Sequence, residues 1–296
     1  MTITSQRIGV AIREPVGWHD FVQIAQTAEE TGYEALFVPE SFGREAFATL
    51  AGLAPVTSTL RLGTGVVAIT SREPRIGAMA AATAQELSGG RFVLGLGAGL
   101  RRSIDAVRAH VREVRETQLA FDPGERPPIW LAALGDRMVE LAAEIADGVL
   151  LNWCTPERVA AAKSSVRRAA ERAGRDPSGI TVAVYVRACV EPDERLALDA
   201  VRPQAQQYAS IPHYQRQLEA VGLGKEAEAA ARGDVPDALI RAVAAVGDAA
   251  AAAARIQAYR DAGADLPFAY PVPALEPVSS ILGTVLALAP SPALEA

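Results

Sequence analysis

Residues 86–99 read ELSGGRFVLGLGAG, and along this stretch a helix ends, a buried strand follows and a Gly-rich loop begins. Gly89 and Gly90 can adopt the left-handed backbone that closes a helix. The apolar run at 92–96 is typical of a strand that is buried on both faces. Gly97 and Gly99 then leave room for a ligand to approach the backbone, although an ordinary strand-to-loop turn can carry the same glycines.

The same order of helix end, glycine and strand recurs along the chain. It is found at 31–38 (TGYEALFV), 147–151 (DGVLL) and 262–269 (AGADLPFA), and no hairpin signal separates these repeats. Strands that are joined through helices run parallel and are linked by right-handed crossovers. Eight such strands predict an α/β fold, a (β/α)8 TIM barrel, and a doubly wound open sheet is the alternative.

The expected elements fill one domain, residues 1–296. The eight strands are expected at 8–12, 35–38, 62–69, 92–96, 129–134, 149–151, 180–190 and 266–270. Helices are expected between them, including those at 46–58, 74–87, 101–119, 156–173, 249–262 and 278–289. Pro203, Pro212 and Gly222 punctuate the Ala-rich segment 192–247, which predicts an insertion of several short helices between strands 7 and 8.

Composition narrows the class of protein. The net charge of −6 and the lack of a basic cluster argue against a nucleic acid partner. No apolar stretch approaches the ~20 residues of a membrane helix, and the start of the chain does not resemble an export signal. Cys154 and Cys189 are far apart and without metal-binding spacing, so we expect buried thiols in a reducing cytoplasm. We expect a small-molecule substrate, no nucleic acid, no membrane association and, where the chain assembles, a homodimer.

In a barrel of this kind the ligand site is built at the carboxyl ends of the strands, so position alone nominates residues. The candidates are Trp18, His19, Glu40, Ser41, Thr70, Arg72, Gly97, Ala98, Gly99, Gly135, Asp136, Arg137, Asn152, Trp153, Arg187 and Tyr270. Several have a structural alternative: Trp18 and His19 can begin a helix, Glu40 can cap one, and Arg187 can be an inward charge that is paired inside the barrel.

The histidines and carboxylates add little metal chemistry. His110 is expected to be solvated on an outer helix, whereas His213 and Tyr214 belong to the insertion, which leaves from the catalytic face and could cover a substrate. No group of histidines or carboxylates has metal-binding spacing, so we predict no metal site.

The segment 132–137, AALGDR, is the strongest candidate for an anion site. It comprises Ala132, Ala133, Leu134, Gly135, Asp136 and Arg137. Gly135 would let the backbone come close to a phosphate, the first amides of the following helix would point at it, and Arg137 could add positive charge. An ordinary strand-to-helix turn is the alternative for this glycine.

Three motifs together carry a resemblance. ITSREP (69–74) with the stretch 86–99, then PPIWLAALGDRMVELAAEIADGVLLNW (127–153) and DAGADLPFAYPV (261–272), resemble the luciferase-like monooxygenase superfamily in its branch that uses the deazaflavin coenzyme F420. The resemblance spans nearly the whole chain. It implies a (β/α)8 barrel that binds the flavin-like ring at the carboxyl ends of its strands, with the phosphate near 134–137.

The resemblance also implies roles for the candidates. The expected cofactor-binding residues are Gly65, Val66, Gly97, Ala98, Gly99, Ala132, Ala133, Leu134, Gly135, Asp136, Arg137 and Asn152, with a non-proline cis peptide between Gly65 and Val66. The expected substrate-binding residues are Trp18, Ser41, Trp153, Arg187, His213 and Tyr214.

Departures from the family pattern bear on the reaction. Alcohol-oxidising members carry an Asp-His pair after strand two and a Glu after the Gly-rich loop, whereas here these positions read Glu40-Ser41 and Leu100. The link between strands four and five is also shortened, at 99–129. Oxidising an alcohol requires a base, and Ser41 and Leu100 cannot serve as one.

We therefore expect a hydride-transferring reductase. Glu40, His19 and Tyr270 are the catalytic candidates for supplying the proton, with water as a further source. The alternatives are an FMN-dependent monooxygenase and a barrel that binds a ligand without catalysis.

Overall fold

The computed structural model describes residues 6–13, 16–41, 43–99 and 103–290. Its strands are β1 (Gly9–Ala11), β2 (Ala35–Val38), β3 (Arg61–Thr64), β4 (Val67–Ala68), β5 (Phe92–Gly97), β6 (Ile129–Ala132), β7 (Gly148–Asn152), β8 (Thr181–Val190), β9 (Ala244–Gly247) and β10 (Leu266–Pro271). Its α-helices are α1 (Trp18–Glu30), α2 (Ala46–Leu53), α3 (Pro74–Leu87), α4 (Ile104–Glu116), α5 (Asp136–Ile145), α6 (Pro156–Arg172), α7 (Glu194–Ala209), α8 (Pro212–Ala220), α9 (Gly224–Ala231), α10 (Asp237–Val243), α11 (Ala249–Asp261) and α12 (Pro277–Ala287), and short 3-10 turns lie at Ala54–Val56 and Pro177–Gly179.

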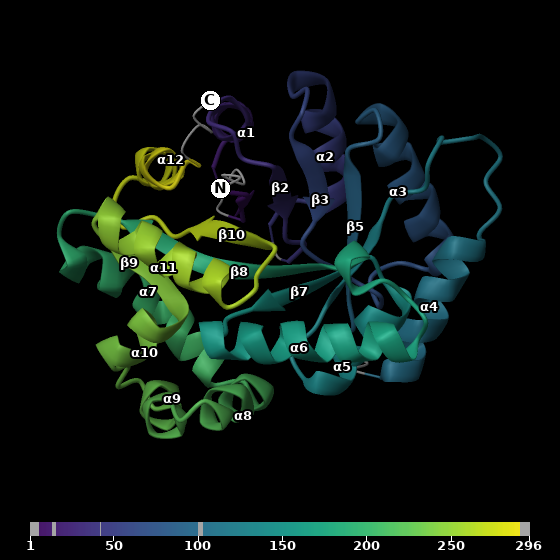
Figure 1. Ribbon diagram of the computed structural model, residues 1–296. Helices are drawn as coiled ribbons and strands as arrows, with labels where there is room; N and C mark the ends of the chain where they lie inside the picture. Colours follow the sequence, from purple (N-terminus) through teal and green to yellow (C-terminus); the bar gives the residue numbers. More distant parts are fainter. Residues whose placement is uncertain (1–5, 14–15, 42, 100–102, 291–296) are drawn as a thin grey trace, which may run out of the picture.

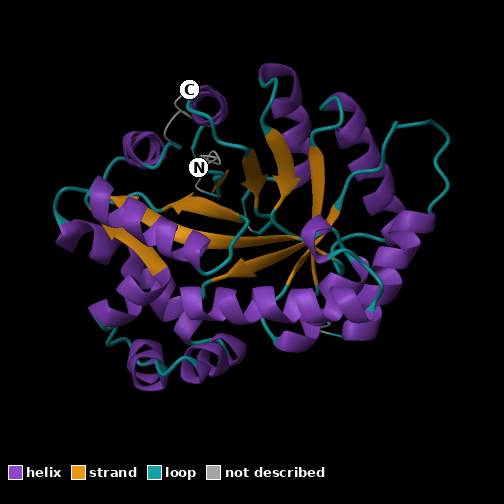
Figure 2. Ribbon diagram, viewed as in Figure 1, coloured by secondary structure: helices purple, strands orange, loops and turns teal. Residues whose placement is uncertain are grey.

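The strands close into a barrel, with helices around its outside (Figures 1 and 2). They pair in parallel in the order β10, β1, β2, β3, β5, β6, β7, β8, and β8 pairs again with β10. This closure confirms the predicted (β/α)8 barrel and excludes the open sheet. Within the described residues, no helix is both long and apolar enough to cross a bilayer.

The stretch that opened the sequence analysis folds as its residue types require. Pro74 begins α3, where a missing N–H costs no hydrogen bond, and Gly89 (φ 62°) and Gly90 (φ 88°) follow the end of that helix in the left-handed conformation. All six residues of β5 are buried, because helices cover the outside of the barrel and side chains fill its interior.

Aromatic rings fill the interior of the barrel by lying over glycines of neighbouring strands. Phe268 lies over Gly9, to which it is paired in register, and an added Cβ at Gly9 would come within 2.4 Å of the ring. Phe37 lies over Gly63 in the same way, and its ring centre is 4.6 Å from that of Phe268. Because side chains fill the middle of the barrel, a ligand can bind only at the carboxyl ends of the strands.

Strand three is divided where the sequence predicts one strand at 62–69. β3 ends at Thr64, the peptide between Gly65 and Val66 is cis, and β4 resumes the pairing with β5. The cis peptide implied by the family resemblance is therefore confirmed. Thr64 fixes this break, because its hydroxyl donates to the carbonyl of Gly95 and accepts from the Gly95 amide, each at 2.8 Å.

The segment between β8 and α11 differs in two places from the expected run of short helices. Pro203 lies inside α7, which is sixteen residues long, instead of ending a helix. Ala244–Gly247 is strand β9, since β8 runs beyond the end of β7 and Arg187–Val190 offer it a free edge. Helices α7 to α10 gather on one side of the barrel (Figure 1).

Candidate active site

A cavity of about 510 Å³ lies at the carboxyl ends of the strands. Its lining comprises Arg13, Pro39, Ser41, Gly65, Val66, Gly97, Ala98, Gly99, Ala132, Ala133, Leu134, Gly135, Met138, Leu150, Asn152, Tyr185, Arg187, Tyr208, His213, Tyr214, Arg216 and Tyr270. This volume is in the usual range for a small-molecule site, about 300–1,000 Å³.

Small residues from β5 and β6 form part of the cavity wall. Gly97, Ala98 and Gly99 come from the end of β5, and Ala132 and Ala133 come from the end of β6. These residues carry at most a methyl group, so this part of the wall leaves room for a flat ring to approach the backbone.

The Gly65–Val66 segment lines the cavity between these strands and β8. The Tyr185 hydroxyl donates to the Gly65 carbonyl oxygen over 3.0 Å and so ties the segment to β8. An added Cβ at Gly65 would come within 1.7 Å of that hydroxyl oxygen, so only glycine fits there.

The amino terminus of α5 opens onto the same cavity. Gly135 is its N-cap, with an extended backbone (φ −89°, ψ 159°), and an added Cβ there would meet no atom within 4 Å. The space beside Gly135 is therefore open, and it lies at the positive end of a ten-residue helix. Arg158 approaches from α6 and donates to the Leu134 carbonyl (2.8 Å) and to the exposed Asp136 carboxylate (2.7 Å).

Arg187 is the centre of a polar network in the cavity wall. It is 98% buried, and it donates from Nε to Gln204 (2.9 Å), from Nη1 to Asn152 (2.8 Å) and from Nη2 to the Tyr208 hydroxyl (2.7 Å). Its guanidinium carbon also lies 4.0 Å from the centre of the Tyr270 ring. A buried guanidinium is stable here because side-chain acceptors and an aromatic face replace its water shell.

Aromatic residues of the insertion complete the network. The Asn152 amide donates to the Tyr214 hydroxyl over 2.7 Å, and the Tyr214 ring packs edge-on against Tyr208 at 4.9 Å. The His213 ring lies 4.6 Å from that of Tyr214. The insertion thus contributes His213 and Tyr214 to the cavity lining.

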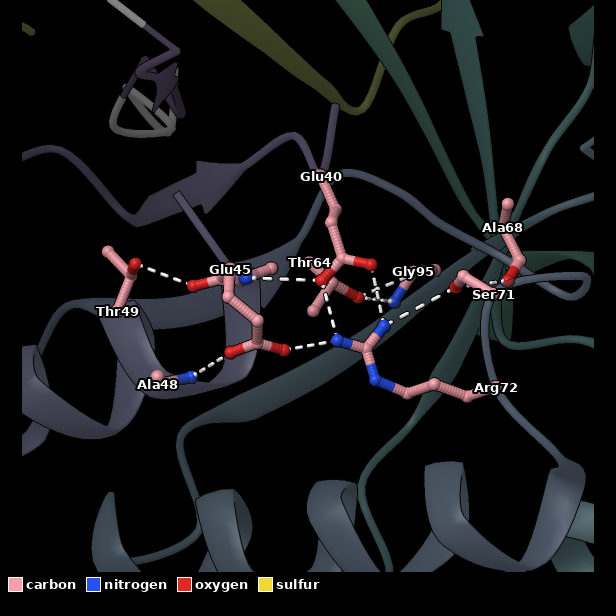
Figure 3. Close-up of polar contacts among 10 residues, drawn as sticks. Glu40, Glu45, Ala48, Thr49, Thr64, Ala68, Ser71, Arg72 and Gly95 are labelled. Carbon is pink, nitrogen blue, oxygen red and sulfur yellow. Dashed lines mark hydrogen bonds and ion pairs between the residues drawn. The ribbon is translucent and has the colours of Figure 1, made fainter. Parts of the chain in front are cut away.

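Glu40 lies outside the cavity lining and faces Arg72 (Figure 3). Its carboxylate accepts from Arg72 Nη1 (2.6 Å) and Nη2 (2.8 Å), and from the Ala46 amide at the start of α2 (3.2 Å). Arg72 also pairs with Glu45. Burial opposes ionisation of Glu40, but the Arg72 hydrogen bonds outweigh it and lower the pKa of this carboxyl. A carboxylate held in this way is a poor proton donor, so its position does not support the expected catalytic role.

Thr70 and Arg72 are absent from the lining, and five more candidates also lie outside it. His19 is exposed on α1, and Trp18, 43% exposed, packs on Phe21 and faces Gly52 of α2. Asp136 and Arg137 point to solvent from the first turn of α5. Trp153 is buried behind Tyr208, on which it stacks at 4.8 Å.

The structure also bears on the expectations for His110, for a metal site and for Leu100. His110, expected to be solvated, is instead buried on the inner face of α4, and burial lowers the pKa of its imidazole. Among the described residues no group of three His, Cys, Asp or Glu side chains could hold a metal ion. Leu100, expected near the reacting centre, lies outside the described residues.

Seven lining residues were missed by the sequence reasoning: Arg13, Pro39, Met138, Leu150, Tyr185, Tyr208 and Arg216. One signal was available, because Tyr185 stands two residues before Arg187 on β8 and alternate strand residues share a face. Tyr208 and Arg216 come from the insertion, and a single sequence does not show which faces of its helices point toward the cavity.

Comparison with known protein sequences places this geometry in context. The profile of the family described as luciferase-like monooxygenase matches residues 1–110 and 100–266. A 5,10-methylenetetrahydromethanopterin reductase of Methanolobus tindarius is 31% identical over 60% of this chain and 64% of its own length. The corresponding reductase of Archaeoglobus fulgidus is 28% identical over 66% and 68%. The chain thus spans about two thirds of the length of these relatives. A putative coenzyme F420-dependent oxidoreductase of Mycobacterium tuberculosis is 33% identical over 45% and 51%.

Solved structures share the whole fold. The coenzyme F420-dependent tetrahydromethanopterin reductase of Methanopyrus kandleri superposes with a TM-score of 0.75 at 20% identity, covering 97% of this chain and 98% of that one. An F420-dependent secondary alcohol dehydrogenase, in complex with an F420-acetone adduct, superposes with a TM-score of 0.79 at 18% identity, covering 96% and 99%. At these identities the likeness establishes the barrel alone.

Proposed function

The chain belongs to the luciferase-like monooxygenase family, and from that premise we propose that it is an oxidoreductase that uses coenzyme F420 to reduce a small organic substrate. The names of its relatives support the cofactor, since two are reductases of a methylene-tetrahydropterin and one is named as F420-dependent. The relatives act on their own substrates, so the substrate class proposed here rests on the cavity.

The residues fit a deazaflavin with a phosphate tail. The glycine and alanine wall offers a flat ring a surface with few side chains, and Gly65 with Val66 lies beside it. The open space at Gly135 gives the phosphate a place against the first amides of α5. Arg13, Arg187 and Arg216 line the cavity, whereas none of the described lining residues is Asp or Glu, so the site favours an anionic ligand.

When bound, the deazaflavin would supply the hydride, and the chain would supply position and electrostatics. We assign the ring to Gly65, Val66, Gly97, Ala98, Gly99, Ala132 and Ala133, and the phosphate to Leu134 and Gly135. Asn152 would contact the cofactor, and Arg187, with His213 and Tyr214 of the insertion, would face the substrate on the other side.

The ion pair of Glu40 with Arg72 is the observation that carries the direction of the reaction. It occupies the carboxylate that stands where alcohol-oxidising relatives would need a proton acceptor. Because no Asp or Glu stands in the described part of the lining, removal of a hydroxyl proton lacks a carboxylate acceptor, whereas a reduction needs a proton donor instead. An activated double bond or an imine is therefore the substrate class that we propose.

The test is a two-way assay of the purified protein without oxygen. In one arm, oxidised F420 is mixed with secondary alcohols and sugar phosphates; in the other, reduced F420 is mixed with enones and imines. We expect turnover in the second arm. Brisk alcohol oxidation with no reduction would overturn the direction, and product that forms only with FMN and oxygen would identify a monooxygenase.

A further inference from the structure

Four tyrosines line the cavity, and one of them, Tyr208 on α7, has a hydroxyl that accepts a hydrogen bond from a guanidinium. Its oxygen accepts from Arg187 Nη2 over 2.7 Å. Among the described residues none is an acceptor for the Tyr208 O–H itself. The proton of this hydroxyl is therefore available to a ligand, while a cation stands at the oxygen that would be left behind.

The other three tyrosines are less suited to release a proton. Tyr185 donates its hydroxyl to the Gly65 carbonyl, and burial raises its pKa. Burial also raises the pKa of Tyr214. Tyr270 presents its ring face to the Arg187 guanidinium.

The charges around Tyr208 favour its ionised form. Burial alone would raise the pKa of its phenol, but the charge of Arg187, a hydrogen bond from Asn152 and the charge of Arg13 outweigh burial and lower it. His213, Tyr214 and Arg216 of α8 are further titratable groups that line the cavity, and Tyr185 of β8 interacts electrostatically with Tyr208. A general acid works best when its pKa lies near the working pH, and a lowered phenol pKa moves in that direction.

The surroundings also hold Tyr208 in place. Trp153 stacks on the Tyr208 ring at 4.8 Å with an interplanar angle of 16°. Trp153 directly follows β7 and has a left-handed backbone, with φ 51°. Gln204 lies one turn earlier on α7 and accepts from Arg187 Nε. The same helix face therefore positions both the phenol and the cation that stabilises its phenolate.

We propose that Tyr208 is the catalytic proton donor of this site, with Arg187 as the positioning residue that stabilises the phenolate; this assignment rests on the proposed reduction. When bound, the reduced deazaflavin would supply the hydride that the electrophilic carbon of the imine or enone takes up. The π-electron pair moves to the nitrogen or to the conjugated oxygen, and that atom takes the proton of the Tyr208 hydroxyl. Solvent then returns a proton to the phenolate, so charge and electrons balance.

The test compares Tyr208→Phe with Tyr33→Phe, which removes the same atom elsewhere. Tyr33 is buried outside the cavity and donates to the Val285 carbonyl over 2.9 Å. For Tyr208→Phe we expect kcat to fall by about 10²- to 10⁴-fold, KM to stay near that of the parent, and the alkaline limb of the pH profile to disappear. Tyr33→Phe should keep the parental kcat and pH profile.

A second readout uses the protein without cofactor. Tyrosinate absorbance is followed as pH rises, and the first phenol to ionise in the parent protein should be missing in Tyr208→Phe and present in Tyr33→Phe. Parental kcat in Tyr208→Phe, or an unchanged first ionisation, would overturn the assignment. Failure of the proposed function looks different, because the parent protein itself would then neither bind F420 nor consume its reduced form, and the proton-donor role would fall with it.

Discussion

Arg72 binds both carboxylate oxygens of Glu40, with Nη1 2.6 Å from Oε1 and Nη2 2.8 Å from Oε2. This two-pronged pair joins the end of β2 to the residue pair that precedes α3 (Figure 3). Both side chains are largely shielded from solvent, with 19% and 15% of their surface exposed. The pair therefore has a structural role at the rim of the barrel as well as a consequence for the reaction.

Glu40→Gln should destabilise the protein at neutral pH by about 1.5–3 kcal/mol, the usual contribution of hydrogen bonds to a charged group. Arg72 lowers the pKa of Glu40 below its ordinary value of 4.5 in the folded state. The stabilisation is therefore complete above pH 4.5 and is lost as pH falls through the lowered pKa. Urea unfolding from neutral to acid pH measures the difference between the parent and the variant, which should shrink on acidification.

Glu30→Gln is the control, since Glu30 is an exposed carboxylate at the end of α1. It should change the unfolding free energy little at any pH. A Glu40→Gln deficit that stays constant down to strongly acid pH would show that the charge of Glu40 is not what stabilises this rim.

Gly95→Ala should destabilise the barrel by about 3 kcal/mol or more, at the upper end for overpacked cores. The added Cβ would come within 1.9 Å of the Thr64 carbonyl oxygen, and a backbone atom cannot rotate away. Gly77→Ala is the matched control, because its Cβ on α3 meets no atom within 4 Å and removing a helical glycine should stabilise by about 0.5–1 kcal/mol. Thermal unfolding of both variants checks these two predictions, and equal melting temperatures in the two variants would contradict them.

The barrel could be predicted from sequence because its signals are local. Several helix ends carry a left-handed glycine, as at Gly32 (φ 88°) and Gly263 (φ 99°), and an apolar strand follows each of these two. Strand β9 could not be predicted, because Ala244–Gly247 has no β-branched run and pairs only with the overhanging end of β8. Tertiary pairing outweighed local propensity there.

The candidate site was predictable only where backbone position sets it. Residues nominated by a place at a strand end, such as Gly99, Gly135 and Tyr270, line the cavity. Side-chain direction was not predictable, since Glu40 also follows a strand but turns to Arg72, which is 32 positions away in sequence. The position of Tyr208 in the cavity depends on how α7 packs against β8, and a single sequence does not predict that contact.

Cys154 and Cys189 should resist alkylation in the folded protein. Both thiols are buried, and burial raises the pKa of each to about 12, so almost no thiolate is present at pH 8. Mass spectrometry after iodoacetamide treatment should find both unmodified in buffer and both modified in denaturant. Rapid labelling of either thiol in buffer would show that its surroundings open readily.

Gly135→Val should abolish binding of the deazaflavin while leaving the fold intact. The backbone at Gly135 is extended, which valine readily adopts, and the new side chain would project into open space at the start of α5. That space is where we place the phosphate. Gly179→Val, whose Cβ also meets no atom within 4 Å but which lies outside the cavity lining, should bind as the parent does. Isothermal titration measures both, and parental affinity in Gly135→Val would mean that the phosphate lies elsewhere.

The most direct test of the account is a parallel titration of the purified protein with oxidised F420 and with FMN, followed by fluorescence and calorimetry. The account predicts saturable binding of F420 at one site per chain, with FMN bound at least about 10-fold more weakly, a difference of about 1.4 kcal/mol. Binding of FMN that is tighter than binding of F420 would contradict it.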